Sequence, residues 1–127
     1  MLLAGIRTVS AQLEYPVEFT TAFPFTVGDA TVPPGTYTIR PDDDNPAILE
    51  LTGGRVTVLF LTNNAAAAAA VARSEVVFKR YGDTYVLKTI WVDGSSTGAM
   101  SVAAEGERHA TKNQGAEREE RVAAQRK

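Results

Sequence analysis

SEVVFKRYGDTYVLKTIWVDG, residues 74–94, decides the fold, because two apolar runs flank a turn signal at Gly82-Asp83. Gly followed by Asp is typical of a two-residue hairpin loop, since Gly adopts a positive φ at the first loop position without steric cost. A loop of this length places Phe78 opposite Leu87. The sequence therefore predicts an antiparallel hairpin around which the remaining strands must pack.

The two faces of this hairpin differ in character, because successive side chains of a strand point to opposite faces. The face expected in the core is apolar and aromatic and comprises Val76, Phe78, Tyr85, Leu87 and Trp91. The face expected to be at least partly solvated carries two lysines and comprises Val77, Lys79, Val86, Lys88 and Ile90. Since an isolated hairpin is marginal in water, we expect other strands to cover the first face.

A second hairpin is predicted for residues 47–62, around Gly53-Gly54. With these two residues as the loop, three apolar pairs form the expected core face: Leu51 with Val56, Leu49 with Val58, and Ala47 with Phe60. The opposite face is also apolar near Leu59, which indicates partial burial there.

The N-terminal half alternates apolar and polar residues over Val17–Val27, which favours a strand. Pro24 lacks a ladder donor, so we expect an edge strand or two short strands broken at that point. Turn signals follow at Gly28-Asp29 and at residues 32–35, VPPG. In the next strand, Tyr37 and Ile39 are expected on one face and Thr36, Thr38 and Arg40 on the other. Later in the chain, residues 99–102 are expected to add a short strand.

Short strands separated by Gly and Pro turns predict an all-β fold. We expect a small antiparallel β-sandwich or a partly open barrel of six or seven strands, connected mainly as a meander and formed by residues 13–102. A helix packed on an α+β sheet is the alternative. The alanine run within residues 63–72 is expected to be a connection with at most one helical turn.

The two ends of the chain are expected to lie outside this β-domain. Residues 103–127 are charged, with Val122 as the only bulky apolar anchor near the C-terminus, and predict a helical or disordered tail. Residues 1–12 are interpreted as a remnant signal peptide or a disordered N-terminus. Val9-Ser10-Ala11 has the small-x-small form of a cleavage site, although Arg7 interrupts a short apolar segment.

Three phrases, FPFTVG, PPGTYTIRP and VVFKRYGDTYVLKTIW, carry a resemblance to a known family. The chain resembles a family of short exported, β-rich bacterial proteins of uncharacterised function, frequent in Acidobacteria-type genomes, over about residues 11–98. The resemblance implies export and a β-rich fold and supplies no catalytic residues. The short N-terminus, the alanine run and a tail without the usual Leu-Pro-Lys stretch depart from the family pattern.

Composition excludes several chemistries. The chain has no Cys, which rules out thiolate catalysis, disulfides and Cys-ligated metals. Its only His, His109, lies in the polar tail, so neither a Ser-His-Asp triad nor a multi-His zinc site is expected. A net charge of −2 disfavours nucleic-acid binding, and no apolar run approaches the ~20 residues that span a bilayer. We therefore expect no enzyme activity and no cofactor.

Acidic residues offer two further hypotheses. The loop PDDDNP, residues 41–46, could be a calcium site but lacks the alternate ligand spacing of such loops and favours a solvated turn. The carboxylates of Glu50, Glu75, Asp83 and Asp93 lie at strand ends or turns, where the sequence places no apolar cleft between a catalytic pair.

Aromatic side chains are the candidate ligand contacts, because rings on a β-face can stack on sugars or apolar ligands. We name Tyr81, Tyr85 and Trp91 as these candidates, with Tyr15 as a further one. The hairpin register places Tyr85 and Trp91 in the core, whereas Tyr81, beside the turn, is expected to be exposed.

These observations lead to two functional hypotheses. The first is an exported, non-catalytic β-module with a structural or binding role in the periplasm or at the cell surface, whose partner is an envelope protein or a glycan. The alternative is a carrier of a small apolar ligand or carbohydrate, with a cavity lined by Phe25, Phe60, Phe78 and Trp91. A cytoplasmic location is the alternative to export, and the oligomeric state is left open.

Overall fold

The computed structural model describes residue 13, residues 15–102 and residues 117–127. The described residues contain ten strands and no helix. The strands are β1 (Val17–Thr21), β2 (Phe25–Val27), β3 (Ala30–Val32), β4 (Gly35–Pro41), β5 (Ile48–Gly53), β6 (Val56–Ala66), β7 (Glu75–Tyr81), β8 (Thr84–Trp91), β9 (Thr97–Ser101) and β10 (Glu117–Arg126).

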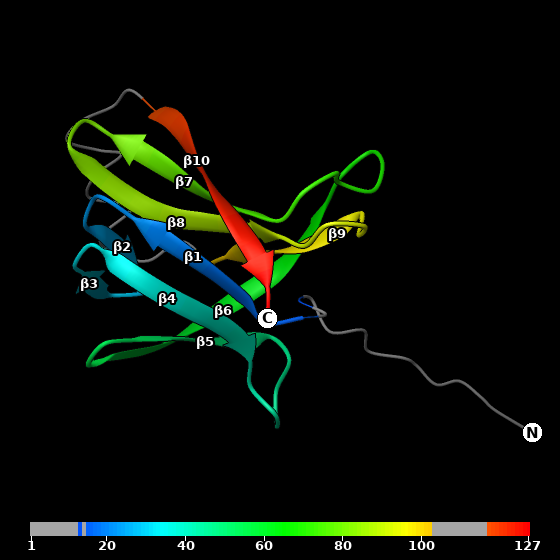
Figure 1. The fold of residues 1–127 in the computed structure, drawn as a ribbon, viewed down its shortest axis with the longest axis horizontal. Helices are drawn as coiled ribbons and strands as arrows, with labels where there is room; N and C mark the ends of the chain where they lie inside the picture. Colours follow the sequence, from blue (N-terminus) through cyan, green and yellow to red (C-terminus); the bar gives the residue numbers. More distant parts are fainter. Residues whose placement is uncertain (1–12, 14, 103–116) are drawn as a thin grey trace, which may run out of the picture.

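The strands form one sheet that closes into a barrel (Figure 1). Its order is β3-β2-β8-β7-β10-β1-β4-β5-β6-β9, and β9 pairs back onto β8, so eight strands complete the ring. The all-β class and the barrel are confirmed, with more strands than the six or seven predicted. The connection is a meander only in part, because β10 inserts between β7 and β1.

The short β2–β3 hairpin lies outside this ring, at one end of the barrel (Figure 1). Thr26 of β2 pairs in parallel with Val86 of β8. Its turn glycine, Gly28, has a φ of 59° and lies against Phe60 of β6. The hairpin therefore contacts both β8 and β6. β1 ends at Thr21 and β2 begins at Phe25, so the predicted break near Pro24 is confirmed.

The β7–β8 hairpin has the predicted turn but contains an unpredicted bulge. Phe78 pairs with Leu87 as expected. The next pair along is Val77 with Thr89, so Lys88 is the extra residue of a bulge in β8. The extra residue reverses the faces of the rest of β8. Ile90 is fully buried and Trp91 is partly exposed, so the prediction was wrong for both residues.

The β5–β6 hairpin turns one residue later than predicted. Gly53 pairs with Val56, and Gly54 takes the left-handed backbone conformation with a φ of 54°. Leu51 consequently pairs with Val58 rather than Val56, a shift of two residues that leaves each side chain on its predicted face. The predicted partial burial of Leu59 was wrong, because its side chain is 58% exposed on the outer surface.

The C-terminal segment is a strand, which corrects the predicted helical or disordered tail for residues 117–126. Helix propensity is a weak preference that tertiary context overrides. Here β7 and β1 would both present open edges, and β10 satisfies their backbone groups by pairing with each. Residues 1–12 and 103–116, for which a signal remnant and the rest of the tail were predicted, lie outside the described residues.

Aromatic rings fill the middle of the barrel. The Phe25 ring centroid lies 5.1 Å from that of Phe78 and 5.7 Å from that of Tyr37, both in edge-on arrangements. Phe19 lies about equally close to these rings, 6.0 Å from Phe25 and 6.1 Å from Phe78. The described residues contain no helix with the length and apolar character required to cross a bilayer.

Candidate binding site at the seam between the first and last strands

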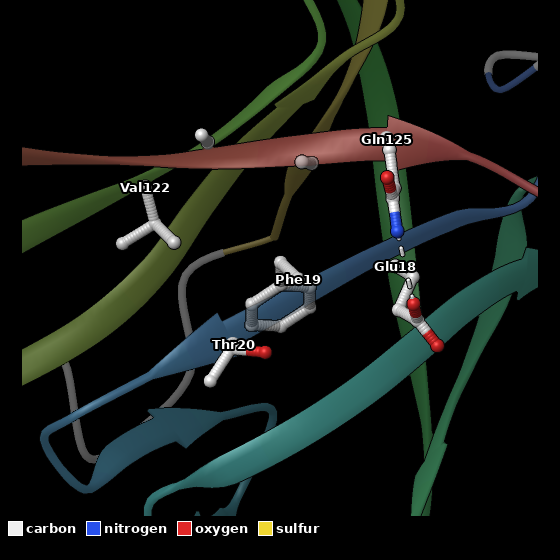
Figure 2. A pocket seen from close by; sticks show the side chains of 7 residues that line it. Glu18, Phe19, Thr20, Val122 and Gln125 are labelled. Carbon is white, nitrogen blue, oxygen red and sulfur yellow. Dashed lines mark hydrogen bonds between the residues drawn. The ribbon is translucent and has the colours of Figure 1, made fainter.

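The barrel is incompletely paired where its first strand meets its last. β10 pairs with β7 over seven residues, Glu117–Ala123, but with β1 over only three, ending at the pair of Phe19 with Ala124. Beyond this pair the two strands diverge (Figure 2). We call this junction the β1–β10 seam.

A pocket of about 320 Å³ lies in the seam. It is lined by Glu18, Phe19, Thr20, Val122, Ala123, Ala124 and Gln125 (Figure 2). Phe19 is buried, and Val122 and Ala124 are half-buried against the same core. The pocket thus combines apolar side chains with two strand backbones that stop pairing with each other, a combination suited to an extended polypeptide.

Polar contacts close the other end of the seam. Gln125 donates an Nε2 hydrogen bond to Glu18 at 3.2 Å, the dashed line in Figure 2, and Lys127 forms an ion pair with the same carboxylate at 3.4 Å. The Lys127 amide donates to the Pro16 carbonyl at 2.9 Å. The C-terminal residues are therefore held beside the start of β1, while the seam stays open beyond Phe19, toward the end of β1.

Arg126 and Asp93 form the best-aligned ion pair near the seam. Arg126 donates from Nε and Nη2 to the two oxygens of Asp93, both at 3.0 Å, and its guanidinium lies 4.7 Å from the Tyr15 ring centroid. The pKa of Asp93 lies below its ordinary value. The hydrogen bond from Arg126 is the largest cause, and the hydrogen bond from Ser74 is the next. The hydrogen bond to Asp93 in turn raises the pKa of Arg126.

A second cross-strand ion pair ties β10 to β7. Arg121 donates to Glu75 at 2.5 Å and to Glu119 at 3.1 Å. The hydrogen bond to Glu75 is the main cause that raises the pKa of Arg121. Both charged groups thus serve strand pairing, and this is the structural role of Glu75, one of the four carboxylates singled out from the sequence.

The three aromatic candidates do not come together in one site. Tyr81 is 3% exposed, so its predicted exposure was wrong. Tyr85 is half-buried and stacks on Phe23, with ring centroids 3.9 Å apart. Trp91 covers Gly98 of β9 so closely that a Cβ at Gly98 would lie 2.7 Å from the indole ring.

The acidic candidates also have structural contacts or lie apart. In the loop of residues 41–46, Asp42 accepts hydrogen bonds from the backbone amides of Asp44 and Asn45, each at 3.1 Å, which is the predicted turn. Within the described ranges, no group of three or more His, Cys, Asp or Glu side chains could hold a metal ion. His109 lies outside those ranges.

Sequence reasoning missed the seam, because it assigned Val122 to a frayed helix. One signal could have pointed to a strand. Val122 and Ala124 alternate with the longer polar side chains of Arg121 and Gln125, which is the pattern of a strand with one face on a core. Nothing in the sequence, however, indicates which strands would accept it.

Comparison of the chain with protein-family models, curated proteins and solved structures returns no match.

Proposed function

We propose that this protein is an exported, non-catalytic β-module that binds an envelope protein through the β1–β10 seam. The observation that carries the proposal is the pocket of about 320 Å³ between two strands that cease to pair, with apolar side chains at its base. A partner's extended segment could add backbone hydrogen bonds there and place one side chain against Phe19 and Val122.

The packing of the barrel interior supports a surface role over the carrier alternative. A carrier requires space among the inner aromatic residues, whereas the Phe25 ring packs against the rings of both Phe78 and Tyr37. Trp91, which the carrier hypothesis placed in the cavity lining, packs on Gly98 instead. A ligand would therefore find more room at the outer surface and the seam than in the packed interior.

Two exposed alanines offer a matched test of the seam. Ala123 lines the pocket, and Ala66 ends β6 elsewhere on the barrel; both are exposed strand residues. We expect Ala123→Arg to reduce recovery of envelope proteins by the purified chain at least tenfold, because the long side chain fills the pocket. Ala66→Arg should leave recovery unchanged. Equal recovery by the two variants would contradict binding at the seam.

The glycan alternative and the export proposal have separate tests. A glycan array probed with the same two variants shows whether seam-dependent binding involves sugars rather than protein. Fractionation of the native host cell, followed by N-terminal sequencing, tests export. We expect the protein in the envelope or outside the cell with Gln12 as its first residue; a cytoplasmic chain that retains residues 1–11 would contradict export.

A further inference from the structure

The last strand of the barrel is not next to the strand that precedes it in the sequence. β10 follows β9 in the sequence, but β9 pairs with β6 and β8, whereas β10 pairs with β7 and β1. In the sheet, the two strands of the β7–β8 hairpin therefore separate β9 from β10. Residues 103–116 join β9 to β10 in the sequence, and a segment of this length could span roughly 45 Å when fully extended. β10 is thus not supplied by a hairpin with the strand that precedes it.

The gap fits β10 by charge as well as by backbone pairing. On the acceptor side, Glu75 of β7 and Glu18 of β1 are acidic. Arg121 of β10 pairs with Glu75, and Lys127, just after β10, pairs with Glu18. Glu119 also lies opposite Lys79, whereas Arg118 lies opposite the like-charged Arg80. Asp93 adds a third acidic group against Arg126. A segment with another charge order would lose these pairs.

The attachment of β10 relies little on apolar burial. Among the β10 side chains that the structure describes, Val122 and Ala124 pack against the core, and both are half-buried. Its ion pairs are solvated: the Arg121 side chain is 53% exposed and that of Lys127 is 48% exposed. Exposed pairs of this kind are screened by salt and contribute little individually. Departure of β10 would break its backbone pairing with β7 and β1 and expose their edges, while the contacts among the rings of Phe19, Phe25 and Phe78 would remain.

We propose that β10 is an exchangeable strand, and that the edges of β7 and β1 accept the β10 of a second copy of this chain to give a strand-swapped dimer. The second copy is the fitting partner because it carries the strand already shown to match the gap in register and charge. Two swapped copies also cover all four edges, which gives a closed, symmetric assembly. This inference does not depend on the proposed envelope partner.

Charge reversal on opposite sides of the junction tests the exchange. An acceptor variant carries Glu18→Lys and Glu75→Arg, and a donor variant carries Arg121→Glu and Lys127→Glu. Each variant alone sets like charges against its own β10. In a swapped heterodimer both junctions regain opposite charges, because the reversed β10 meets the reversed acceptor and the unmodified β10 meets the unmodified acceptor.

The two variants, with different affinity tags, are denatured, mixed and refolded together at low salt, and their mass is measured by light scattering. We expect a species of twice the chain mass that carries both tags and that decreases at high salt. Variants that fold separately and remain monomeric in the mixture would overturn the proposal.

Net charge is controlled with reversals remote from β10. Asp43→Lys with Asp44→Lys matches the acceptor variant, and Arg55→Glu with Arg73→Glu matches the donor variant; all four residues are exposed. This control mixture should remain monomeric. A control dimer in equal amount would assign association to net charge alone and overturn the proposal.

A second measurement covers the case in which the reversed variants fail to fold. A chain without the charge reversals, carrying one protease site introduced within residues 103–116, is cut at that site and incubated with a fluorescent peptide of residues 117–127. We expect the peptide to replace the resident strand, which is detected as fluorescence that co-elutes with the barrel. Absence of incorporation under conditions in which the resident segment dissociates would refute an exchangeable β10.

Discussion

At the scale of single residues, the two glycines of the β5–β6 turn are required for different reasons. A Cβ at Gly53 would lie 2.4 Å from the Thr36 carbonyl oxygen and 2.5 Å from the Tyr37 ring, so this position requires a missing side chain. Gly54 instead has open space but a φ of 54°, so it requires a tolerant backbone. The sequence motif Gly-Gly does not reveal this division.

Substitutions at these glycines should therefore have unequal effects. Gly53→Ala should lower the free energy of unfolding by about 1–3 kcal/mol, the usual cost of forcing atoms into a packed site. Gly54→Asn should cost less than about 1 kcal/mol, because Asn tolerates the left-handed region. Urea unfolding of both variants measures the difference. Equal losses would contradict the close approach of Tyr37 to Gly53.

The ion pair of Asp93 predicts an acid-dependent contribution to stability. Because the pKa of Asp93 is lowered in the folded state, the contribution is present above the ordinary pKa of 3.8 and is lost as the pH falls through the lower folded value. Asp93→Asn should therefore be less stable than the unmodified chain at about pH 6 and nearly equal to it well below the ordinary pKa of a carboxyl group. Thermal melting over this range tests the convergence; a constant difference would contradict the assigned pair.

At the scale of elements, the sequence supports both hairpins, the β7–β8 turn and most inward-facing residues, because these follow from local alternation and turn chemistry. Tyr37 and Ile39 share one face as predicted, and both are buried. The bulge at Lys88 was not predictable from alternation, since β8 reads as a regular strand with or without it. It follows from how β7, β8 and β9 must curve to close the ring.

The bulge reverses the sequence prediction of which residue, Ile90 or Trp91, faces the core, and this reversal can be tested. Ile90→Ala should lower the free energy of unfolding by about 2–5 kcal/mol, because it leaves a cavity in the core. Trp91→Ala should cost less, since its partly exposed indole packs on Gly98 at the surface. Chemical denaturation of both variants ranks them, and a larger loss for Trp91→Ala would restore the unbulged register.

β10 shows what local patterns cannot supply. Its residues favour a helix, and Glu117 with Arg121 has the spacing of a helical ion pair. In the structure Arg121 instead pairs with Glu75, 46 residues earlier in the chain. The candidate site depends on this long-range pairing, so neither the seam nor its lining could be deduced before the strand order was known.

At the scale of the whole molecule, the barrel combines a tightly packed interior with one junction held mainly at its surface. The aromatic core joins residues from β1, β2, β4 and β7 and does not depend on salt. The junction of β10 combines backbone pairing to β7 and β1 with solvated ion pairs, and the attraction within these ion pairs weakens as ionic strength rises. Opening of β10 should therefore be a local event that precedes global unfolding.

Hydrogen exchange should resolve this order. At low salt, amides of β10 should exchange faster than those of β4 and β5, and raising the salt to about 1 M should accelerate β10 further while the other strands change little. Because β7 and β1 lose their partner in the same opening, their facing amides should accelerate together with β10. Mass spectrometry of peptides from each strand measures the rates. If β10 exchanges only with the entire barrel at every salt concentration, its attachment belongs to the core, and the distinction between interior and junction fails.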